Sequence, residues 1–141
     1  MITYHSDKQE NRVYDVLPQA IEKAAKDVLD AAFKVHTALG PGLLESVYEA
    51  CLAYELHQRG IQVETQVVLP VVYEGLRLET GLRLDMLVEK CLIVEIKAVD
   101  NINPIHAAQL LTYLKLADKR LGLLINFNTV HLKYGIKRIV N

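Results

Sequence analysis

The segment Leu92-Ile93-Val94-Glu95-Ile96-Lys97 constrains the fold more than any other part of the sequence. It is apolar except for two charged residues near its end. An almost continuous apolar run of this length is typical of a central strand covered on both faces. Glu95 and Lys97 are two positions apart, so they share one face of that strand. Because an unpaired buried charge is expensive, the fold must bring polar partners to this face.

Hydrophobic periodicity along the rest of the chain predicts helices on both sides of this segment. Apolar residues recur at helical spacing over residues 18–39 and again up to about Arg59. Gly40-Pro41-Gly42 separates these two helices, with proline suited to a first-turn position. Asn103-Pro104 has the cap and first-turn proline of a third helix, which reaches about Ala117.

Runs with strand periodicity or continuous apolar character predict a mixed sheet. The expected strands are Val63–Tyr73, Leu76–Val88, Leu92–Lys97, Leu121–Phe127 and Ile136–Val140. The third helix should act as a crossover that places residues 121–127 parallel to residues 92–98, through a right-handed connection. The order α-α-β-β-β-α-β-β therefore predicts an α/β fold, a mixed β-sheet flanked by helices.

Length and composition fit one domain. The chain has 141 residues, of which 51% are hydrophobic and 23% are charged, values of an ordinary globular protein. We expect a single domain over residues 16–141 and a loose N-terminus over residues 1–15. The formal net charge is −1, so a nucleic acid would have to be held by a local basic patch rather than by an overall field.

Cysteine content and hydropathy favour a cytoplasmic protein. Cys51 and Cys91 are too few for a disulfide framework or a four-cysteine metal site, and they lie in apolar runs that favour buried, reduced thiols. No apolar run approaches the ~18 residues of a transmembrane helix, so we expect no membrane partner. The polar residues 1–14 contain no signal-peptide core.

The turn before the central segment decides whether a third ionisable residue, Asp85, meets Glu95. Alternation over residues 76–88 places Leu84 and Met86 on one face and Asp85 on the other. A two-residue turn at Glu89-Lys90 would send the carboxylates of Asp85 and Glu95 to opposite faces. A three-residue loop that includes Cys91 pairs the two acids directly, and a β-bulge would restore the same facing. We therefore predict an odd-length loop or a bulge.

Two opposed carboxylates destabilise a sheet unless a positive charge neutralises them. One interpretation is a buried salt bridge between Lys97 and the acids. The other is a divalent cation, Mg²⁺ or Mn²⁺, bound by Asp85, Glu95 and the backbone carbonyl of Ile96. Such a cation polarises a phosphoryl oxygen and makes its bound water more acidic. Lys97 would then orient or deprotonate the attacking water, or stabilise charge in the transition state.

Three motifs, in the right order on the expected elements, resemble those of one nuclease group. Asp85 followed by Glu95-Ile96-Lys97 on the next strand resembles the PD-(D/E)XK nuclease superfamily. Pro41-Gly42-Leu43-Leu44-Glu45-Ser46-Val47-Tyr48 resembles the signature of its GxxExxY family, and Gln109-Leu110-Leu111-Thr112-Tyr113 resembles the QxxxY motif of RecB-like members. The resemblance covers residues 18–140 and departs from the superfamily pattern at Leu84, which stands in place of the proline.

The resemblance implies a restriction-endonuclease-like core and cleavage of phosphodiester bonds that depends on Mg²⁺ or Mn²⁺. It implies that Glu45 contacts the metal or its waters, although a solvated acid near a helix N-terminus is the alternative. Gln109 and Tyr113 share a helix face. Gln109 would hold a water or a phosphate oxygen, and Tyr113 would stack or hydrogen-bond near the substrate.

Three further residues receive weaker expectations. Tyr48, one turn after the helix acid, is either a core residue or a wall of the site that contacts substrate. Arg83, two positions before the strand aspartate, is the best candidate for a phosphate contact. His106 lies on the helix face of Gln109, and we expect it to be structural because a lone histidine has no ligand spacing.

These features together predict a nuclease that hydrolyses nucleic acid, DNA rather than RNA, with water activated by Mg²⁺. Two alternatives stay open. One is a non-catalytic module that binds nucleic acid or protein and retains the nuclease fold, although intact acids argue against it. The other is a nuclease subunit that needs a partner protein or forms a homodimer, because a near-neutral chain has little means to grip a duplex alone. Endonuclease or exonuclease action and sequence preference depend on surfaces that sequence patterns do not place.

Overall fold

The computed structural model describes residues 16–141, and the loose N-terminus expected for residues 1–15 lies outside the described residues. The chain forms α2 (Gln19–Leu39), α3 (Glu45–Gln58), β1 (Val63–Tyr73), β2 (Leu76–Val88), β3 (Leu92–Lys97), α4 (Pro104–Ala117), β4 (Leu121–Asn126), the 3₁₀ helix η1 (Leu132–Gly135) and β5 (Ile136–Val140). The predicted order of helices and strands is confirmed, with η1 as an addition.

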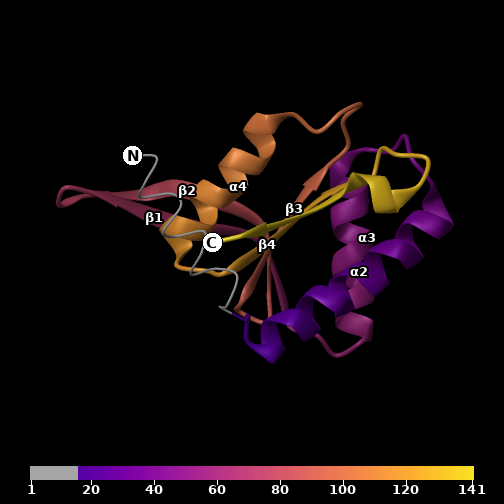
Figure 1. The fold of residues 1–141 in the computed structure, drawn as a ribbon, viewed down its shortest axis with the longest axis horizontal. Helices are drawn as coiled ribbons and strands as arrows, with labels where there is room; N and C mark the ends of the chain where they lie inside the picture. The colour runs from indigo at the N-terminus through magenta and orange to yellow at the C-terminus, as the bar shows by residue number, and fades with distance from the viewer. Residues whose placement is uncertain (1–15) are drawn as a thin grey trace.

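One mixed sheet holds all five strands in the order β1-β2-β3-β4-β5. Neighbouring strands are antiparallel except β3 and β4, which are parallel as predicted. Helices α2 and α3 cover one face of the sheet and α4 covers the other (Figure 1). The predicted α/β class is confirmed. None of the helices within residues 16–141 is long and apolar enough to cross a membrane.

Each face of the sheet buries its own hydrophobic core. The core under α2 and α3 includes Val28, Tyr48, Leu52, Val94 and Ile96, and the core under α4 includes Leu84, Ile93, Leu110, Leu114 and Leu124. Strand β3 therefore sends alternate residues into opposite cores, as expected for a strand covered on both faces. Each buried aliphatic side chain stabilises the fold by about 1.5–3 kcal/mol.

Partway along β2, the alternation of side chains between the two cores is interrupted. On β2, Leu84 packs in the α4 core, whereas Met86 packs in the α2/α3 core. The prediction that these two residues share a face is therefore wrong. The interruption coincides with a left-handed backbone at Gln66 on β1, with φ of 52°, a conformation that non-glycine residues rarely adopt.

The strands keep their register across this point. Thr65 pairs with Met86 and Val67 pairs with Leu84, so Gln66 lies opposite Asp85 and no residue is inserted. Only the direction of the side chains changes. The left-handed backbone at Gln66 therefore lies at the position of the predicted site, opposite Asp85, where the side-chain directions change.

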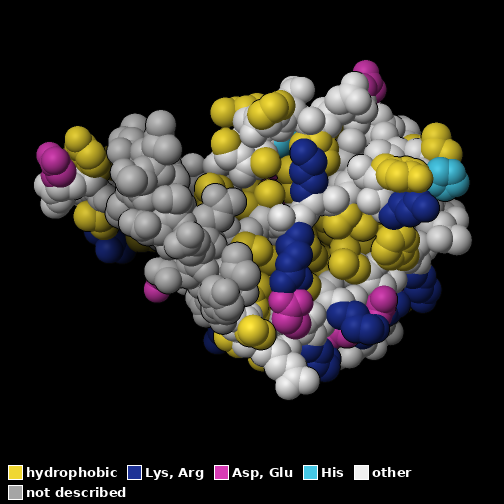
Figure 2. Space-filling model, in the orientation of Figure 1, with side chains coloured by type: hydrophobic (Ala, Val, Ile, Leu, Met, Phe, Trp, Pro, Cys, Tyr) yellow, Lys and Arg dark blue, Asp and Glu magenta, His cyan; other side chains and the backbone are white. Residues whose placement is uncertain are grey.

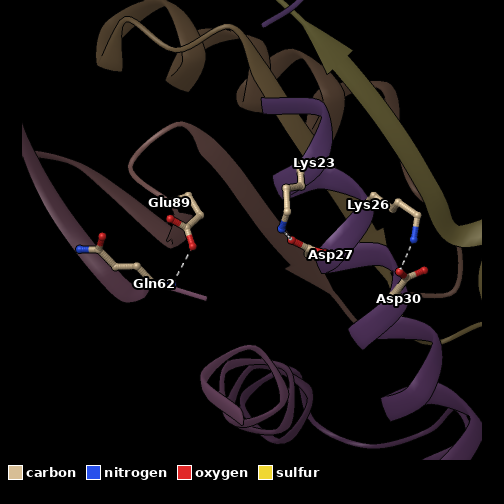
Figure 3. A network of polar contacts seen from close by, with 6 residues as sticks. All are labelled: Lys23, Lys26, Asp27, Asp30, Gln62 and Glu89. Carbon is tan, nitrogen blue, oxygen red and sulfur yellow. Dashed lines mark hydrogen bonds and ion pairs between the residues drawn. The ribbon is translucent and has the colours of Figure 1, made fainter. Parts of the chain in front are cut away.

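The loop between β2 and β3 has three residues, as predicted. Glu89 and Lys90 have φ values of 50° and 56°, which turn the chain tightly. The backbone N of Glu89 donates to the carbonyl of Gln62 at 2.8 Å, and the backbone N of Gln62 donates to Oε1 of Glu89 at 3.0 Å (Figure 3). Val88 then pairs with Leu92, and the register runs to Met86 opposite Val94, directly before Asp85 and Glu95.

The far ends of β1 and β2 form a two-stranded arm that extends beyond the helices (Figure 1). Val72, Tyr73 and Leu76 near its tip are 58%, 65% and 58% exposed. The strands approach closely at Gly81, where a Cβ atom would lie 2.6 Å from Cγ2 of Val71. The arm thus presents apolar side chains to solvent, which is unusual for a surface without a partner.

Candidate active site

Strands β2 and β3 separate at Asp85 and Glu95. Their backbone ladder runs from Val88–Leu92 to Met86–Val94. Beyond it, the backbone N of Ile96 donates to Oδ2 of Asp85 at 2.9 Å, and the backbone N of Asp85 donates to Oε1 of Glu95 at 3.4 Å. Carboxylates thus replace carbonyls as acceptors, and these bonds hold the two acids close to each other.

Glu95 is the most buried acid of the site, with 5% of its surface exposed. Burial and the neighbouring Asp85 raise the pKa of Glu95 to about 9, against the smaller opposing effect of the Lys97 charge. Within residues 16–141, no lysine, arginine or histidine forms an ion pair with Glu95 or Asp85. The buried salt bridge with Lys97, one of the two interpretations of the sequence, is therefore not formed.

Lys97 ends β3 beside Asn126 of β4 and is partly exposed. Asn126 is 2% exposed. Its Oδ1 accepts hydrogen bonds from the backbone N of Val99 at 3.1 Å and of Asn128 at 3.2 Å, and its Nδ2 donates to the Val99 carbonyl at 2.8 Å. The backbone N of Phe127 donates to the Lys97 carbonyl at 2.9 Å. These hydrogen bonds fix the backbone at the end of β3, where Lys97 lies.

A pocket of about 210 Å³ adjoins Asp85 on the α3 side of the sheet. Its lining consists of Glu45, Ser46, Glu49, Gln66, Asp85 and Ile96. A larger depression of about 490 Å³, beside the C-terminal end of α2, has no carboxylate among its described lining residues. Three acids, Glu45, Glu49 and Asp85, line the smaller pocket. Glu95 is not in its lining, but its Oε1 accepts from the backbone N of Asp85, so we place the candidate site there.

Tyr48 fixes the loop that leads into α3 and Glu45. It is fully buried, and its ring stacks on Phe127 with centroids 4.6 Å apart. Its hydroxyl donates to the Gly40 carbonyl at 2.6 Å and accepts from the backbone N of Leu43 at 3.1 Å. This environment does not fit a contact between Tyr48 and substrate. Of its two expected roles, the core role agrees with the structure, and Tyr48 positions the loop.

Replacing Tyr48 with phenylalanine should lower the free energy of unfolding by about 1–3 kcal/mol, because the Leu43 N–H loses its buried acceptor while the ring stacking is retained. Urea denaturation measures this change. Tyr54→Phe on the same helix is the control, since Tyr54 is 61% exposed and should change stability by less than about 0.5 kcal/mol. Equal stability of the two variants would contradict the positioning role.

The two predicted site residues of helix α4 lie in different environments. Burial and then the negative charges of Glu95 and Asp85 raise the pKa of Tyr113, which places its hydroxyl in the field of the two acids. Gln109 is exposed, and its side chain has no hydrogen-bond partner within residues 16–141. Tyr113 is therefore influenced by the charge of both acids, whereas the Gln109 side chain lies in solvent.

The other candidates lie at the edges of the site. Glu45 is exposed and lines the pocket with Asp85. Arg83 is exposed, and its Nη1 donates to Oε1 of Gln66 at 3.5 Å. Nδ1 of His106 accepts a hydrogen bond from the backbone N of Asn103 at 3.1 Å, so His106 caps α4, in agreement with its expected structural role.

Sequence reasoning missed three residues that shape the site: Glu49, Gln66 and Asn126. Glu49 lies one helical turn after Glu45, so the spacing of four could have found it. Asn126 is the one polar residue in the apolar run of residues 121–127, a signal of a buried, hydrogen-bonded side chain. Gln66 carries no such signal, because its importance comes from its partners across the fold.

A family model described as the PD-(D/E)XK nuclease superfamily matches residues 22–139. The chain belongs to this superfamily. The predicted restriction-endonuclease-like fold is thereby confirmed. A solved structure titled "Crystal structure of SSO0001" is similar over 100% of this chain and 78% of its own chain, with a TM-score of 0.52 and 19% identity, a likeness of fold alone. No curated protein matches the sequence.

Nucleases of the PD-(D/E)XK superfamily act on nucleic acid and typically use divalent metals. Among residues 16–141, no three His, Cys, Asp or Glu side chains gather closely enough to hold an ion. Mg²⁺, however, usually keeps several waters and takes one or two carboxylates from the protein. Asp85 and Glu95 supply such a pair without a neutralising basic partner, so the donor set of this PD-(D/E)XK domain fits a hydrated divalent ion.

Basic side chains of the domain are dispersed on the face shown in Figure 2. Lysine and arginine appear there singly, interspersed with acidic side chains, and do not form a continuous patch. This agrees with the formal net charge of −1. A phosphate backbone would therefore meet isolated cations on this face rather than a broad positive surface.

Proposed function

We propose that this protein is a metal-dependent nuclease whose ligands for Mg²⁺ or Mn²⁺ are Asp85, Glu95 and the backbone carbonyl of Ile96. One observation carries the proposal. Two carboxylates meet at the point where β2 and β3 separate, one of them is 5% exposed, and no basic side chain within residues 16–141 pairs with them. Because ionised, unpaired buried acids are costly, a divalent cation is the neutraliser that this arrangement favours.

A divalent ion at this position would supply Lewis acidity and a more acidic bound water. Lys97 lies two positions after Glu95 on β3 and is proposed to orient or deprotonate the attacking water, or to stabilise charge in the transition state. Glu45 is proposed to contact the metal through water. Tyr113 is proposed to hydrogen-bond or stack near the scissile phosphate.

Gln109 and Arg83 are proposed substrate contacts. Both are exposed, so each can reach a water or a phosphate oxygen without displacing core residues. With Tyr113, Gln109 gives the QxxxY pattern of RecB-like members, and residues 42–48 give the GxxExxY pattern. We propose membership of that subgroup and DNA rather than RNA as the substrate.

Incubation of DNA and RNA with the protein and Mg²⁺ or Mn²⁺ tests the proposal. We expect cleavage of DNA, slowed about 100-fold or more by Asp85→Asn, because losing a metal ligand removes several kcal/mol and each ~1.4 kcal/mol is a factor of ten. Asp118→Asn is the control, since Asp118 is an exposed acid at the end of α4. Cleavage that survives Asp85→Asn and Lys97→Ala equally well would come from a contaminant.

A second candidate is a nuclease subunit that acts as a homodimer or with a partner protein. The exposed apolar side chains of the β1–β2 arm favour it, since such surfaces mark interaction sites. Sedimentation velocity with parallel cleavage assays separates the cases. A monodisperse monomer that cuts efficiently would remove the need for a partner. A non-catalytic binding module would show no Mn²⁺ binding by calorimetry.

A further inference from the structure

We propose that Glu49, held in place by Gln66, is a further acid of the metal centre that accepts hydrogen bonds from waters of the bound cation. The proposal rests on the proposed function and adds a residue pair to the same site. Gln66 is then a positioning residue that acts through Glu49. Neither residue belongs to the three motifs that the sequence presents.

The position of Glu49 differs from that of Glu45, the acid of the sequence motif. Glu49 is half-buried, whereas Glu45 is exposed, and both line the pocket that contains Asp85 and Ile96. A Mg²⁺ ion that keeps several waters needs acceptors for the protons of those waters. A partly buried carboxylate with restricted motion meets that need better than a solvated one.

The partner of Glu49 is a neutral amide. Nε2 of Gln66 donates to Oε1 of Glu49 at 2.6 Å. Within residues 16–141, no basic side chain forms an ion pair with Glu49. An amide orients the carboxylate without neutralising it, so its negative charge stays available to a hydrated cation.

The Gln66 amide also stands between Glu49 and Arg83. Its Oε1 accepts from Nη1 of Arg83 at 3.5 Å while its Nε2 faces Glu49. Without this amide, the carboxylate and the guanidinium could pair directly, since such charge-assisted pairs are strong. Gln66 thereby keeps the carboxylate of Glu49 available to the cation and leaves the guanidinium of Arg83 available to bind a phosphate.

The backbone of Gln66 directs its side chain to this place. Its left-handed conformation, at φ of 52°, lies opposite Asp85 in the ladder. A non-glycine residue in this region costs about 1–3 kcal/mol and persists only where surrounding contacts enforce it. Gln66 thus lies across from Asp85 while its side chain hydrogen-bonds to Glu49, so one residue adjoins both acids.

Calorimetric titration of the full chain with Mn²⁺ alone tests Glu49. We expect Glu49→Gln to weaken Mn²⁺ binding by about 10–100-fold, the usual loss for an outer-shell partner. Glu64→Gln is the matched control, because Glu64 is an exposed acid on β1 outside the pocket lining and removes the same charge. It should change the dissociation constant by no more than about twofold, as screening of exposed charges predicts.

Two substitutions separate the amide of Gln66 from its backbone. Gln66→Gly removes the amide and tolerates the left-handed conformation, whereas Gln66→Ala removes the amide and keeps the strain. Both should weaken Mn²⁺ binding to the same degree, while the glycine variant unfolds at a higher urea concentration. Weakening confined to the alanine variant would show that backbone geometry alone matters and would overturn the positioning role of the amide.

Nuclear magnetic resonance provides a measurement that would show no effect if Gln66 had a purely structural role. Added Mn²⁺ should broaden the side-chain amide signals of Gln66 in the wild-type protein and spare those of the exposed Gln109 until higher occupancy. Mn²⁺ binding that is lost in Asp85→Asn but unchanged in Glu49→Gln overturns this inference and leaves the proposed function intact. Absence of Mn²⁺ binding and cleavage in the wild-type protein overturns both.

Discussion

Replacing Lys97 with methionine should slow Mg²⁺-dependent DNA cleavage by a factor of about 10²–10⁴, the contribution typical of a positioned general acid or base. Methionine retains the unbranched chain and removes only the ammonium group. Lys97 forms no ion pair within residues 16–141 and lies at the end of β3, so the fold should tolerate the change. Single-turnover cleavage at saturating Mg²⁺ measures the chemical step.

Metal binding should persist in the Lys97 variant, because the positive charge opposes a cation rather than holding it. Lys90→Met provides the control, since Lys90 is exposed in the β2–β3 loop and outside the site. A variant at Lys97 that loses Mn²⁺ binding would assign the residue to the structure of the site. A variant that cleaves as fast as wild type would remove Lys97 from the chemistry.

Replacing Glu95 with glutamine should stabilise the metal-free protein at alkaline pH and remove its stabilisation by Mn²⁺. The folded protein raises the pKa of Glu95 from 4.5 to about 9. A carboxyl group with a raised folded pKa contributes stability below about pH 4.5, and this contribution is lost as pH rises toward 9. The neutral amide of glutamine has no such loss.

We therefore expect equal stability of the two proteins near pH 4 and an advantage of about 2 kcal/mol or more for Glu95→Gln near pH 9, since each pKa unit corresponds to about 1.4 kcal/mol. Urea denaturation in chelator at both pH values measures it. Mn²⁺ should stabilise wild type through binding to the folded state and leave the variant unchanged. A stability difference that is independent of pH would contradict the titration of Glu95.

Much of the fold was predictable because local patterns carry it. The apolar run of residues 92–97 predicted the buried strand, and the side-chain alternation of two strands predicted an odd-length loop or a bulge after Val88, where the structure has a three-residue loop. The parallel pairing of β3 and β4 followed from the crossover helix. These inferences need only residues that are neighbours in the chain.

The features that the sequence left open, missed or predicted wrongly share a different cause. Met86 packs opposite to Leu84 at the point where Gln66, on the neighbouring strand, adopts a left-handed backbone. Tyr48 is buried because Phe127 and the Gly40–Leu44 loop enclose it. Glu49 lines the pocket beside Asp85 and accepts a hydrogen bond from Gln66 of β1. None of these contacts can be predicted from the hydrophobic periodicity of a single segment.

Consecutive residues thus determine which helices and strands form and in what order. They also determine which two acids come close across one hairpin. Both follow because helix and strand propensity and side-chain alternation act over short range. The surroundings of those acids depend on the packing of α3 and α4 against the sheet. That packing joins residues far apart in the chain, as Glu49 with Gln66 and Tyr48 with Phe127. Burial, and with it the raised pKa of Glu95, exists only after both faces of the sheet are covered.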